Sequence, residues 1–274
     1  MKQPILGFIG AGNMAASLIS GLIADGYPAE RIWVSDINAH ALAHLASEYG
    51  VHTTPRNAIV AENAQVLVLA VKPQILAEVV RELAPLIQAR RPLVVSIAAG
   101  INTASIDRWA GEDVAIVRCM PNTPAMVKAG ATGLFATPRV SVEQRSQAEA
   151  ILRAVGLTVW VEEETQLDAV TALSGSGPAY FFLFMEAMEE AGIALGLEPT
   201  TARLLAQQTA LGAGRIAIES TEPPAELRRR VTSPGGTTER AIAAFEAGGL
   251  RPLVAEAMQA AARRATELSE QLGG

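Results

Sequence analysis

The sequence predicts an α/β fold in two parts: a doubly wound parallel sheet over residues 1–164, followed by an all-helical segment over residues 165–274. Three observations lead to this prediction. In the first half of the chain, short β-branched runs alternate with helical patterns, as in parallel strands joined by right-handed crossovers. A glycine-rich turn follows the first of these runs and opens a helix. After about Glu164, apolar residues recur every three or four positions without a further β-rich run, which indicates helices alone.

The predicted elements of the first part follow this alternation in chain order. The β-rich runs predict strands at Ile5–Ile9, Arg31–Ser35, Val51–Thr53, Val66–Val71, Leu93–Ile97 and Val114–Arg118. The stretches between them predict helices at Asn13–Ala24, Ala39–Tyr49, Asn57–Ala61, Gln74–Gln88 and Thr103–Trp109. Gly26, Gly50 and Gly111 mark helix ends, as glycine often does at a helix C-terminus. Two more strands, Ala131–Ala136 and Leu157–Val161, are expected around a helix that Ser141 opens, with Gln144 at the capping-box position.

Turn-forming residues divide the helical part. Breaks are expected at Ser174–Pro178, Gly196–Pro199, Pro223–Pro224, Ser233–Gly236 and Gly248–Gly249. The helices between them are rich in Ala, Leu and Met, a composition that suits close helix packing. A segment of about 110 residues with this composition would expose a large apolar patch if it stood alone, so we expect it to form a dimer interface.

Composition and charge exclude two classes of protein. The 274 residues are 50% hydrophobic but only 4% aromatic, and 28 acidic against 22 basic side chains leave a formal charge of -6. This sign opposes binding to a phosphate backbone, so a nucleic-acid partner is not expected. Glycine and serine interrupt the uncharged stretches Gln3–Ala24 and Ala169–Met185, so neither predicts a signal peptide or a membrane span.

Cysteine and histidine content bears on the compartment and on metals. Cys119 is the only cysteine, which excludes an internal disulfide and favours a reducing compartment, hence the cytoplasm. The histidines, His40, His44 and His52, all lie in the first fifth of the chain. Because no further ligand type clusters near them, we interpret His40 and His44 as part of a solvated helix face and expect no metal site.

Residues 10–15 have the pattern of a dinucleotide-binding turn. They read G-x-G-x-x-A, directly after a predicted strand and directly before a predicted helix. Gly10 allows the tight turn, Gly12 lets the backbone approach a pyrophosphate, and Ala15 permits close packing of helix on strand. The helix N-terminus offers free N–H groups to the anion. Spacing and context therefore favour a Rossmann-type site over a plain glycine turn.

The choice between NADH and NADPH depends on the end of the second predicted strand. Asp36 lies about twenty residues beyond the glycine motif, where an acid accepts a hydrogen bond from the ribose 2′-OH and repels a 2′-phosphate. Ser35 and Asn38 flank it as neutral donors, and a carboxylate turned outward would not act on the ribose. The rule favours NADH and leaves both cofactors open.

Three further segments follow predicted strands at the carboxyl edge of the sheet, where such folds bind ligands. Lys72, within Ala70–Pro73, either contacts cofactor phosphate or ribose or is a solvated residue before the helix that Pro73 starts. The small residues Ser96–Gly100 would let a nicotinamide ring lie against the backbone. Two prolines fix the loop Met120–Pro124, in which Asn122 either faces a ligand or caps the turn.

Two Gly/Ser/Thr-rich loops in the helical part form a second candidate site. They are Ser174–Tyr180 (SGSGPAY) and Thr232–Thr238 (TSPGGTT), and each opens a helix. Unpaired N–H groups and hydroxyls at such places bind small anions, although ordinary helix caps are the alternative for either loop taken singly. Because no lysine follows Lys128, a carboxylate on the second loop would sit in a nest of neutral donors.

Over essentially its full length the chain resembles the pyrroline-5-carboxylate reductases, which catalyse the last step of proline biosynthesis. The resemblance rests on Gly7–Met14, Ala70–Pro73, Cys119–Pro124, Ser174–Tyr180 and Leu227–Thr238. It implies a Rossmann domain followed by a helical domain that interleaves with that of a second subunit, so that each active site is composite. Dimers in this family often assemble into decamers.

The resemblance also implies roles for individual residues. The cofactor, NADPH with NADH possible, would be held by Ile9, Gly10, Ala11, Gly12, Asn13, Met14, Ser35, Asn57, Ala70, Val71, Lys72, Pro73, Ser96, Ala98 and Ala99, to which the position after the second strand adds Asp36. The substrate would be held by Ser176, Gly177, Ser233, Gly235, Gly236, Thr237 and Thr238. Of these, Thr238 is the candidate catalytic residue, with its hydroxyl facing the ring nitrogen. Asp36 stands where many relatives carry a neutral or basic residue, so a strict NADPH preference is not expected.

The implied reaction is hydride transfer from NAD(P)H to the cyclic imine 1-pyrroline-5-carboxylate, with L-proline as the product. A β-hydroxyacid dehydrogenase shares the layout, but enzymes of that kind resemble one another in a helical-domain lysine that handles the alcohol proton, and this chain has none. A non-catalytic NAD(P)-sensing protein is the other alternative. It would be expected to carry a damaged substrate loop, whereas Ser233–Thr238 is intact.

Overall fold

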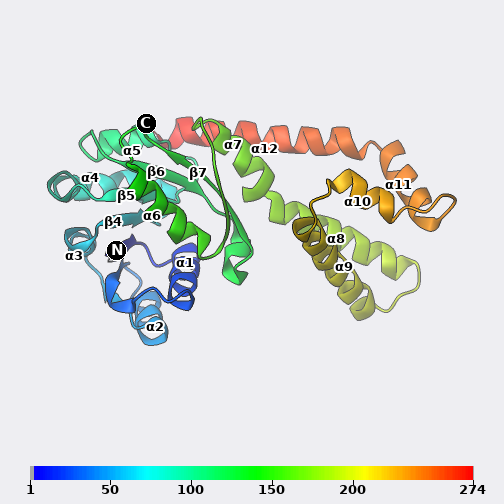
Figure 1. Ribbon diagram of the computed structural model, residues 1–274, viewed down its shortest axis with the longest axis horizontal. Helices are drawn as coiled ribbons and strands as arrows, with labels where there is room; N and C mark the ends of the chain where they lie inside the picture. Colours follow the sequence, from blue (N-terminus) through cyan, green and yellow to red (C-terminus); the bar gives the residue numbers. More distant parts are fainter. Residues whose placement is uncertain (1–2, 274) are drawn as a thin grey trace. The chain divides into compact units, whose positions relative to one another are not determined.

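The computed structural model describes residues 3–273 (Figure 1). The chain forms two compact units: one runs to Ser176 and resumes at Ala260, and the other is Gly177–Gln259. The sequence predicted the boundary between the two parts at residues 164 and 165, where the hydrophobic pattern changes. The residues from there to Ser176 are helical as expected, but they belong to the unit that contains the sheet.

The first unit contains an eight-stranded sheet in the order β3-β2-β1-β4-β5-β6-β7-β8. Its strands are β1 Leu6–Ile9, β2 Ile32–Ser35, β3 His52–Thr54, β4 Val66–Leu69, β5 Leu93–Ser96, β6 Ile116–Met120, β7 Gly130–Ala136 and β8 Gly156–Trp160. Strands β1 to β6 are parallel, which confirms the predicted doubly wound fold. Strand β7 runs antiparallel to β6, because only a short 3-10 turn, Thr123–Val127, joins them and no crossover helix intervenes. Strand β8 is parallel to β7.

Six helices cover the two faces of this sheet: α1 Asn13–Ala24, α2 Ala39–Tyr49, α3 Asn57–Asn63, α4 Pro73–Arg90, α5 Thr103–Trp109 and α6 Val142–Arg153. Successive strand residues point to opposite faces, so Phe8 packs under α1, α2 and α6, whereas Ile9 packs under α3, α4 and α5. Both cores are almost entirely aliphatic, in keeping with the composition. The apolar run of β1 is therefore buried on both sides.

Several helix ends confirm the signals in the sequence. Ser141 and Gln144 form the predicted capping box at the start of α6. Asn38 caps α2 by accepting from the N–H groups of His40 and Ala41, and Gly50 ends that helix in the left-handed conformation.

The observed β6 begins two residues later than predicted. The segment before it stays in a turn, because Glu112 and Asp113 have positive φ angles of 69° and 60°. In addition, the Val114 N–H donates to the Asp107 carboxylate at 2.9 Å instead of entering the sheet. The strand also ends two residues later, at Met120 instead of Arg118, next to the proline-rich loop.

The predicted all-helical segment is confirmed, with every expected break. Its elements are α7 Gln166–Val170, a π-helical turn Thr171–Gly175, α8 Gly177–Ala194, α9 Pro199–Glu219, α10 Pro224–Arg230, α11 Thr237–Ala247 and α12 Leu250–Leu272. Within Gly177–Gln259 very few side chains are buried. Large apolar side chains are exposed instead, among them Phe181 at 67% and Leu211 at 64%.

The C-terminal part of α12 belongs to the first unit and packs beside α5 (Figure 1). A Cβ on Gly100 would lie 3.2 Å from Leu268 Cβ, so the turn after β5 touches this helix directly. The Gly273 carbonyl accepts hydrogen bonds from the Ser105 hydroxyl at 2.7 Å and from the Arg108 guanidinium at 2.6 Å. The Thr266 hydroxyl donates to the Asp168 carboxylate at 2.8 Å.

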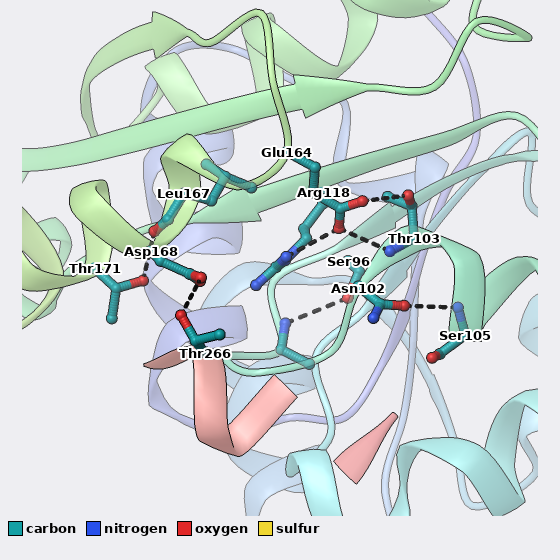
Figure 2. Close-up of polar contacts among 11 residues, drawn as sticks. Ser96, Asn102, Thr103, Ser105, Arg118, Glu164, Leu167, Asp168, Thr171 and Thr266 are labelled. Carbon is teal, nitrogen blue, oxygen red and sulfur yellow. Dashed lines mark hydrogen bonds and ion pairs between the residues drawn. The ribbon is translucent and has the colours of Figure 1, made fainter. Parts of the chain in front are cut away.

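A partly buried ion pair ties β6 to the start of α5 (Figure 2). Glu164 Oε1 accepts from Arg118 Nη1 at 2.9 Å and from the Thr103 N–H at 2.8 Å, while Oε2 accepts from the Thr103 hydroxyl at 2.6 Å. The Arg118 side chain is only 7% exposed. Because Thr103 opens α5, this carboxylate fixes the segment that leaves the end of β5, where part of the cofactor site is expected.

Replacing Glu164 by Ala should lower the free energy of unfolding by about 3 kcal/mol, because it leaves the buried guanidinium of Arg118 without its partner. Urea unfolding followed by circular dichroism measures this change. The matched control is Glu163→Ala, an exposed neighbour, which should stay within about 0.5 kcal/mol of the parent chain. Equal losses for the two variants would contradict the role given to Glu164.

Candidate functional site

Four parallel strands end side by side at one edge of the sheet. In the register of the sheet, Ile9 lies opposite Ser35 on one side and Leu69 on the other, and Leu69 lies opposite Ser96. The residues expected to hold the cofactor all lie at these ends, directly after them, or at the start of α3. The topology thus brings together segments that lie up to about 90 positions apart, at the edge where open α/β sheets bind ligands.

The turn after β1 has the geometry expected of Gly10 and Gly12. Gly10 has a φ angle of 107°, and a Cβ there would lie 2.8 Å from the carbonyl carbon and oxygen of Ala70. Its N–H donates to the Ser35 carbonyl at 2.7 Å, which joins the turn to β2. Only glycine satisfies both the positive φ angle and the close approach of β4.

The N-terminus of α1 faces open space. A Cβ built on Gly12 meets no atom within 4 Å. Gly12 is also the N-cap of α1 and has no side chain to accept from the first-turn N–H groups. Ala15 is 1% exposed and packs into the core below. A pyrophosphate fits here, because the helix supplies donors and the missing side chain supplies room.

Asp36 faces the glycine turn. Its Oδ2 accepts from the Ala11 N–H at 2.7 Å, and its Oδ1 accepts from the Asn38 N–H at 2.8 Å. The outward orientation left open by the sequence is therefore not adopted. The carboxylate lies at the end of β2, held by two backbone donors.

Ser35 and Asn57 form a pair beside Asp36. The Ser35 side chain is fully buried, and its hydroxyl donates to Asn57 Oδ1 at 2.8 Å. Among residues 3–273, this bond leaves the two N–H donors on Nδ2 of Asn57 available at the edge of the sheet. The structure thus places both residues at the edge that Gly10 and Asp36 occupy.

The segment after β4 supplies backbone rather than buried side chains. Ala70 continues the sheet by donating to the Ile9 carbonyl at 2.8 Å, and Pro73 opens α4. Lys72 is exposed at the N-cap position of that helix and forms no ion pair within residues 3–273. This position agrees both with a contact to cofactor phosphate or ribose and with a solvated residue before the helix.

Asn122 has a structural role in the loop after β6. It is 8% exposed, its Nδ2 donates to the Ser174 carbonyl at 2.9 Å, and its Oδ1 accepts from the Ala131 N–H at 2.8 Å. Both halves of its amide are therefore engaged inside the protein. The bonds hold the SGSG segment against the end of β6, where a Cβ on Gly175 would lie 2.7 Å from Met120 Cε.

The π-helical turn positions Ser176. Its N–H donates to the Thr171 carbonyl at 2.8 Å, five residues back, and α8 begins at the next residue. Such π turns are frequent at functional sites. Ser176 is half-buried and Gly177 is buried.

The second loop, Ser233–Thr238, precedes and opens α11 in the helical unit. Gly235 has a φ angle of 74°, and its N–H donates to the Glu239 carboxylate at 2.7 Å. The Gly236 N–H donates to the Ser233 carbonyl at 3.0 Å. Two of the predicted carboxylate donors are therefore used within the loop. The N–H groups of Thr237 and Thr238 have no partner in the described part of the chain, and both residues are exposed.

Sequence reasoning did not single out Glu239, although a signal for it exists. Glu239 is the third residue of α11 after the N-cap Gly236, the spacing at which an acid commonly reaches back to a free N–H. Arg118 and Glu164 were missed as well. They lie 46 positions apart, and no local pattern links them.

Other chemistries find little support in this structure. Burial raises the pKa of the Cys119 thiol, so it is poorly suited to act as a nucleophile. Among residues 3–273, no three His, Cys, Asp or Glu side chains gather as metal ligands would. Within the same residues, every helix is too short or too polar to cross a bilayer.

Two family models match the chain. Residues 164–268 match the model described as pyrroline-5-carboxylate reductase dimerisation, and residues 5–100 match the model described as NADP oxidoreductase, coenzyme F420-dependent. The match over residues 5–100 contains the glycine turn and the four strand ends. The match over residues 164–268 contains both Gly/Ser/Thr-rich loops, Ser174–Tyr180 and Thr232–Thr238.

Relatives and solved structures agree over the whole chain. A pyrroline-5-carboxylate reductase of Pseudomonas aeruginosa is 53% identical over 273 residues, with 100% of both chains covered. The structure of a pyrroline-5-carboxylate reductase from Coxiella burnetii matches with a TM-score of 0.95 and 50% identity, covering 98% of this chain and 99% of that one. A Plasmodium falciparum pyrroline carboxylate reductase with NADP bound matches with a TM-score of 0.85 and 27% identity, over 98% and 99% of the two chains.

Proposed function

The chain belongs to the pyrroline-5-carboxylate reductase family, and from this premise we propose how its residues carry out the reaction. The protein is an NAD(P)H-dependent oxidoreductase that reduces the cyclic imine 1-pyrroline-5-carboxylate to L-proline, the final step of proline biosynthesis. The observation that carries this assignment is a match over the full length, which includes both the glycine turn and the Ser233–Thr238 loop.

The proposed cofactor site is the edge formed by the four strand ends. The free N–H groups at the start of α1 hold the pyrophosphate, and Gly12 leaves room for it. Asp36 and Asn57, after β2 and at the start of α3, would hold the adenosine ribose, while the small residues Ser96, Ala98 and Ala99, at and after the end of β5, would hold the nicotinamide. The hydrogen bonds of Thr103 and Asn122 keep the neighbouring segments in place. When bound, the reduced nicotinamide supplies the hydride.

The proposed carboxylate nest of the substrate is the start of α11. Within residues 3–273, the N–H groups of Thr237 and Thr238 and the hydroxyls of Ser233, Thr237 and Thr238 are donors that the bonds inside the loop do not use. The Glu239 carboxylate already accepts from the Gly235 N–H, which supports the ability of this loop to hold a carboxylate. Gly235 and Gly236 then shape the nest, and Ser176 and Gly177 line the imine from the other loop.

The chain needs no strong acid for this chemistry. A cyclic imine is basic enough to be protonated near neutral pH, and the iminium carbon is then an electrophile. What remains is to hold the two reactants in a reactive geometry, which lowers a barrier by about 7–11 kcal/mol in favourable cases. We assign to the Thr238 hydroxyl a hydrogen bond to the ring nitrogen, through which a proton is donated or relayed.

The alternatives agree less well with the chain. The alcohol oxidation of a β-hydroxyacid dehydrogenase would need a lysine in the helical part, and the sequence has no lysine after Lys128. A non-catalytic sensor would have no use for a loop in which two N–H groups and two threonine hydroxyls remain available.

We also propose that the protein acts as a homodimer with interleaved helical segments, that such dimers assemble into decamers, and that it works in the cytoplasm. The exposed apolar side chains of α8 and α9 support the dimer, because a surface of this kind is stable in water only when a partner covers it. The dimerisation family model covers the same helices.

The assignment is tested by following the loss of reduced-nicotinamide absorbance with 1-pyrroline-5-carboxylate, with NADPH and NADH in parallel. We expect oxidation of the cofactor that depends on the imine, together with formation of proline. No oxidation with either cofactor would overturn the assignment.

Replacing Thr238 by Ala should lower kcat at least tenfold while leaving the Kd for NADPH unchanged, because the hydroxyl is proposed to act on the substrate nitrogen alone. Steady-state kinetics and a direct cofactor titration measure the two quantities. Thr221→Ala, an exposed threonine in the loop before α10, is the matched control and should behave as the parent chain. Parent-like turnover in the Thr238 variant would remove this residue from the mechanism.

Replacing Gly12 by Ala should raise the Kd for NADPH at least tenfold and leave the free energy of unfolding nearly unchanged, because the added methyl group meets no protein atom and enters the space assigned to the pyrophosphate. Calorimetric titration and urea unfolding give the two values. Gly10→Ala should differ by losing stability as well, since its Cβ collides with Ala70. An unchanged Kd in the Gly12 variant would move the pyrophosphate elsewhere.

Replacing Leu211 by Asp should reduce the oligomer to monomers, because it places a charge on the exposed apolar surface of α9 that a partner would cover. Light scattering coupled to gel filtration measures the mass. Val142→Asp, at the start of α6 in the other unit, is a control at a position that is more exposed than Leu211, and its oligomer should persist. Loss of the oligomer in both variants, or in neither, would contradict the proposed interface.

A further inference from the structure

We propose that Asp36 is a specificity-determining residue of the cofactor site, which disfavours the 2′-phosphate of NADPH and favours the free 2′-hydroxyl of NADH. This inference rests on the proposed function, because it assigns the cofactor edge to a nicotinamide dinucleotide. It goes beyond that function by naming the residue that sets the ratio between the two cofactors. The argument depends on where the carboxylate lies, how it is held and which charges surround it.

Asp36 is held in position from two sides. One oxygen accepts from the Ala11 N–H of the glycine turn at 2.7 Å, and the other accepts from the Asn38 N–H at 2.8 Å. The side chain is half-buried at the end of β2, beside the Ser35 and Asn57 pair. To swing away from the ribose, the carboxylate would have to give up both hydrogen bonds, so its negative charge stays at this point of the edge.

Each carboxylate oxygen keeps a lone pair after accepting one N–H bond. A ribose 2′-hydroxyl therefore finds an acceptor at Asp36, as in other folds with an acid at this position. A 2′-phosphate carries nearly two negative charges and has no hydroxyl proton to donate to Asp36. The carboxylate therefore repels it and already occupies the Ala11 and Asn38 N–H donors that a phosphate could use.

The residues around Asp36 do not compensate for its charge. Ile37 follows it and is 97% exposed, and the Asn38 side chain is engaged in capping α2. The cationic residues before α3 and α4, Arg56 and Lys72, are both exposed, and within the described residues 3–273 neither pairs with Asp36. The donor that a hydrogen bond holds at this edge is the neutral amide of Asn57, which serves a hydroxyl as well as a phosphate.

The test compares the intact protein with Asp36→Ser and Asp36→Asn. The Kd values for NADPH and NADH, and those for the fragments 2′,5′-ADP and 5′-AMP, are measured by calorimetric titration. Both variants should bind NADPH and 2′,5′-ADP about tenfold more tightly than the parent, while binding of NADH weakens a few-fold. The Asn variant keeps the size of the side chain and one acceptor for Ala11, so it separates the effect of charge from loosening of the turn.

Asp25→Ser is the matched control. It makes the same change in net charge at the far end of α1, where Asp25 is exposed and pairs with Lys128. Its ratio of Kd values for NADPH and NADH should equal that of the parent.

An unchanged ratio in both Asp36 variants, or an equal loss of both cofactors in both, would overturn the proposal. Because the readout is binding, it does not depend on imine reduction. A parent protein that binds both cofactors but never oxidises them with the imine would refute the proposed function and leave the role of Asp36 measurable.

Discussion

The close approach of β1 and β4 at Gly10 is the constraint on which the cofactor half of the molecule depends. A side chain at this position would collide with the Ala70 backbone, so the two central strands end together only because Gly10 has none. The same turn aims the N-terminus of α1 outward and presents the Ala11 N–H to Asp36. One missing Cβ thus sets the spacing of the strands, the direction of the helix and the position of the acid. The hydrogen bonds of Thr103 and Asn122 extend this order to the segments around β5 and β6.

The helical segment follows a different principle, since its own core is small. Between Gly177 and Gln259, small side chains such as Ala202 and Ala206 are buried, while phenylalanine and leucine side chains remain exposed. The short loop at the start of α11 lies within this segment. The part of the protein that is proposed to recognise the substrate therefore also relies on association for its stability, which links activity to protein concentration.

Much of the fold could be predicted from the sequence because its signals are local. The strand and helix alternation, the G-x-G-x-x-A turn and the Ser141–Gln144 capping box each depend on residues within a few positions of one another. Two features could not be predicted for the opposite reason. The orientation of Asp36 depends on the Ala11 amide 25 positions away, and the role of Asn122 depends on Ser174, 52 positions away. The start of β6 was predicted too early for a different reason: the Val114 N–H bonds to Asp107, seven positions before it, in place of a strand partner. The predicted roles of the substrate residues rest on resemblance, since no pattern in the loop itself specifies which donors remain free.

The discontinuity of the first unit has a consequence for folding kinetics. The strands of its sheet all lie before Val161, but two hydrogen bonds join the end of the chain to this unit. The bond from Ser105 to Gly273 spans 168 positions, and the bond from Thr266 to Asp168 spans 98. The whole of Gly177–Gln259 lies within the loop that those bonds close. Contacts of such sequence separation slow folding, because the entropy of a long loop is lost before the contacts form. The sheet should therefore appear early and the docking of α12 late. Before α12 docks, the hydrogen bond from Thr103 to Glu164 would already hold the segment after β5, while Gly100 would not yet be covered by Leu268.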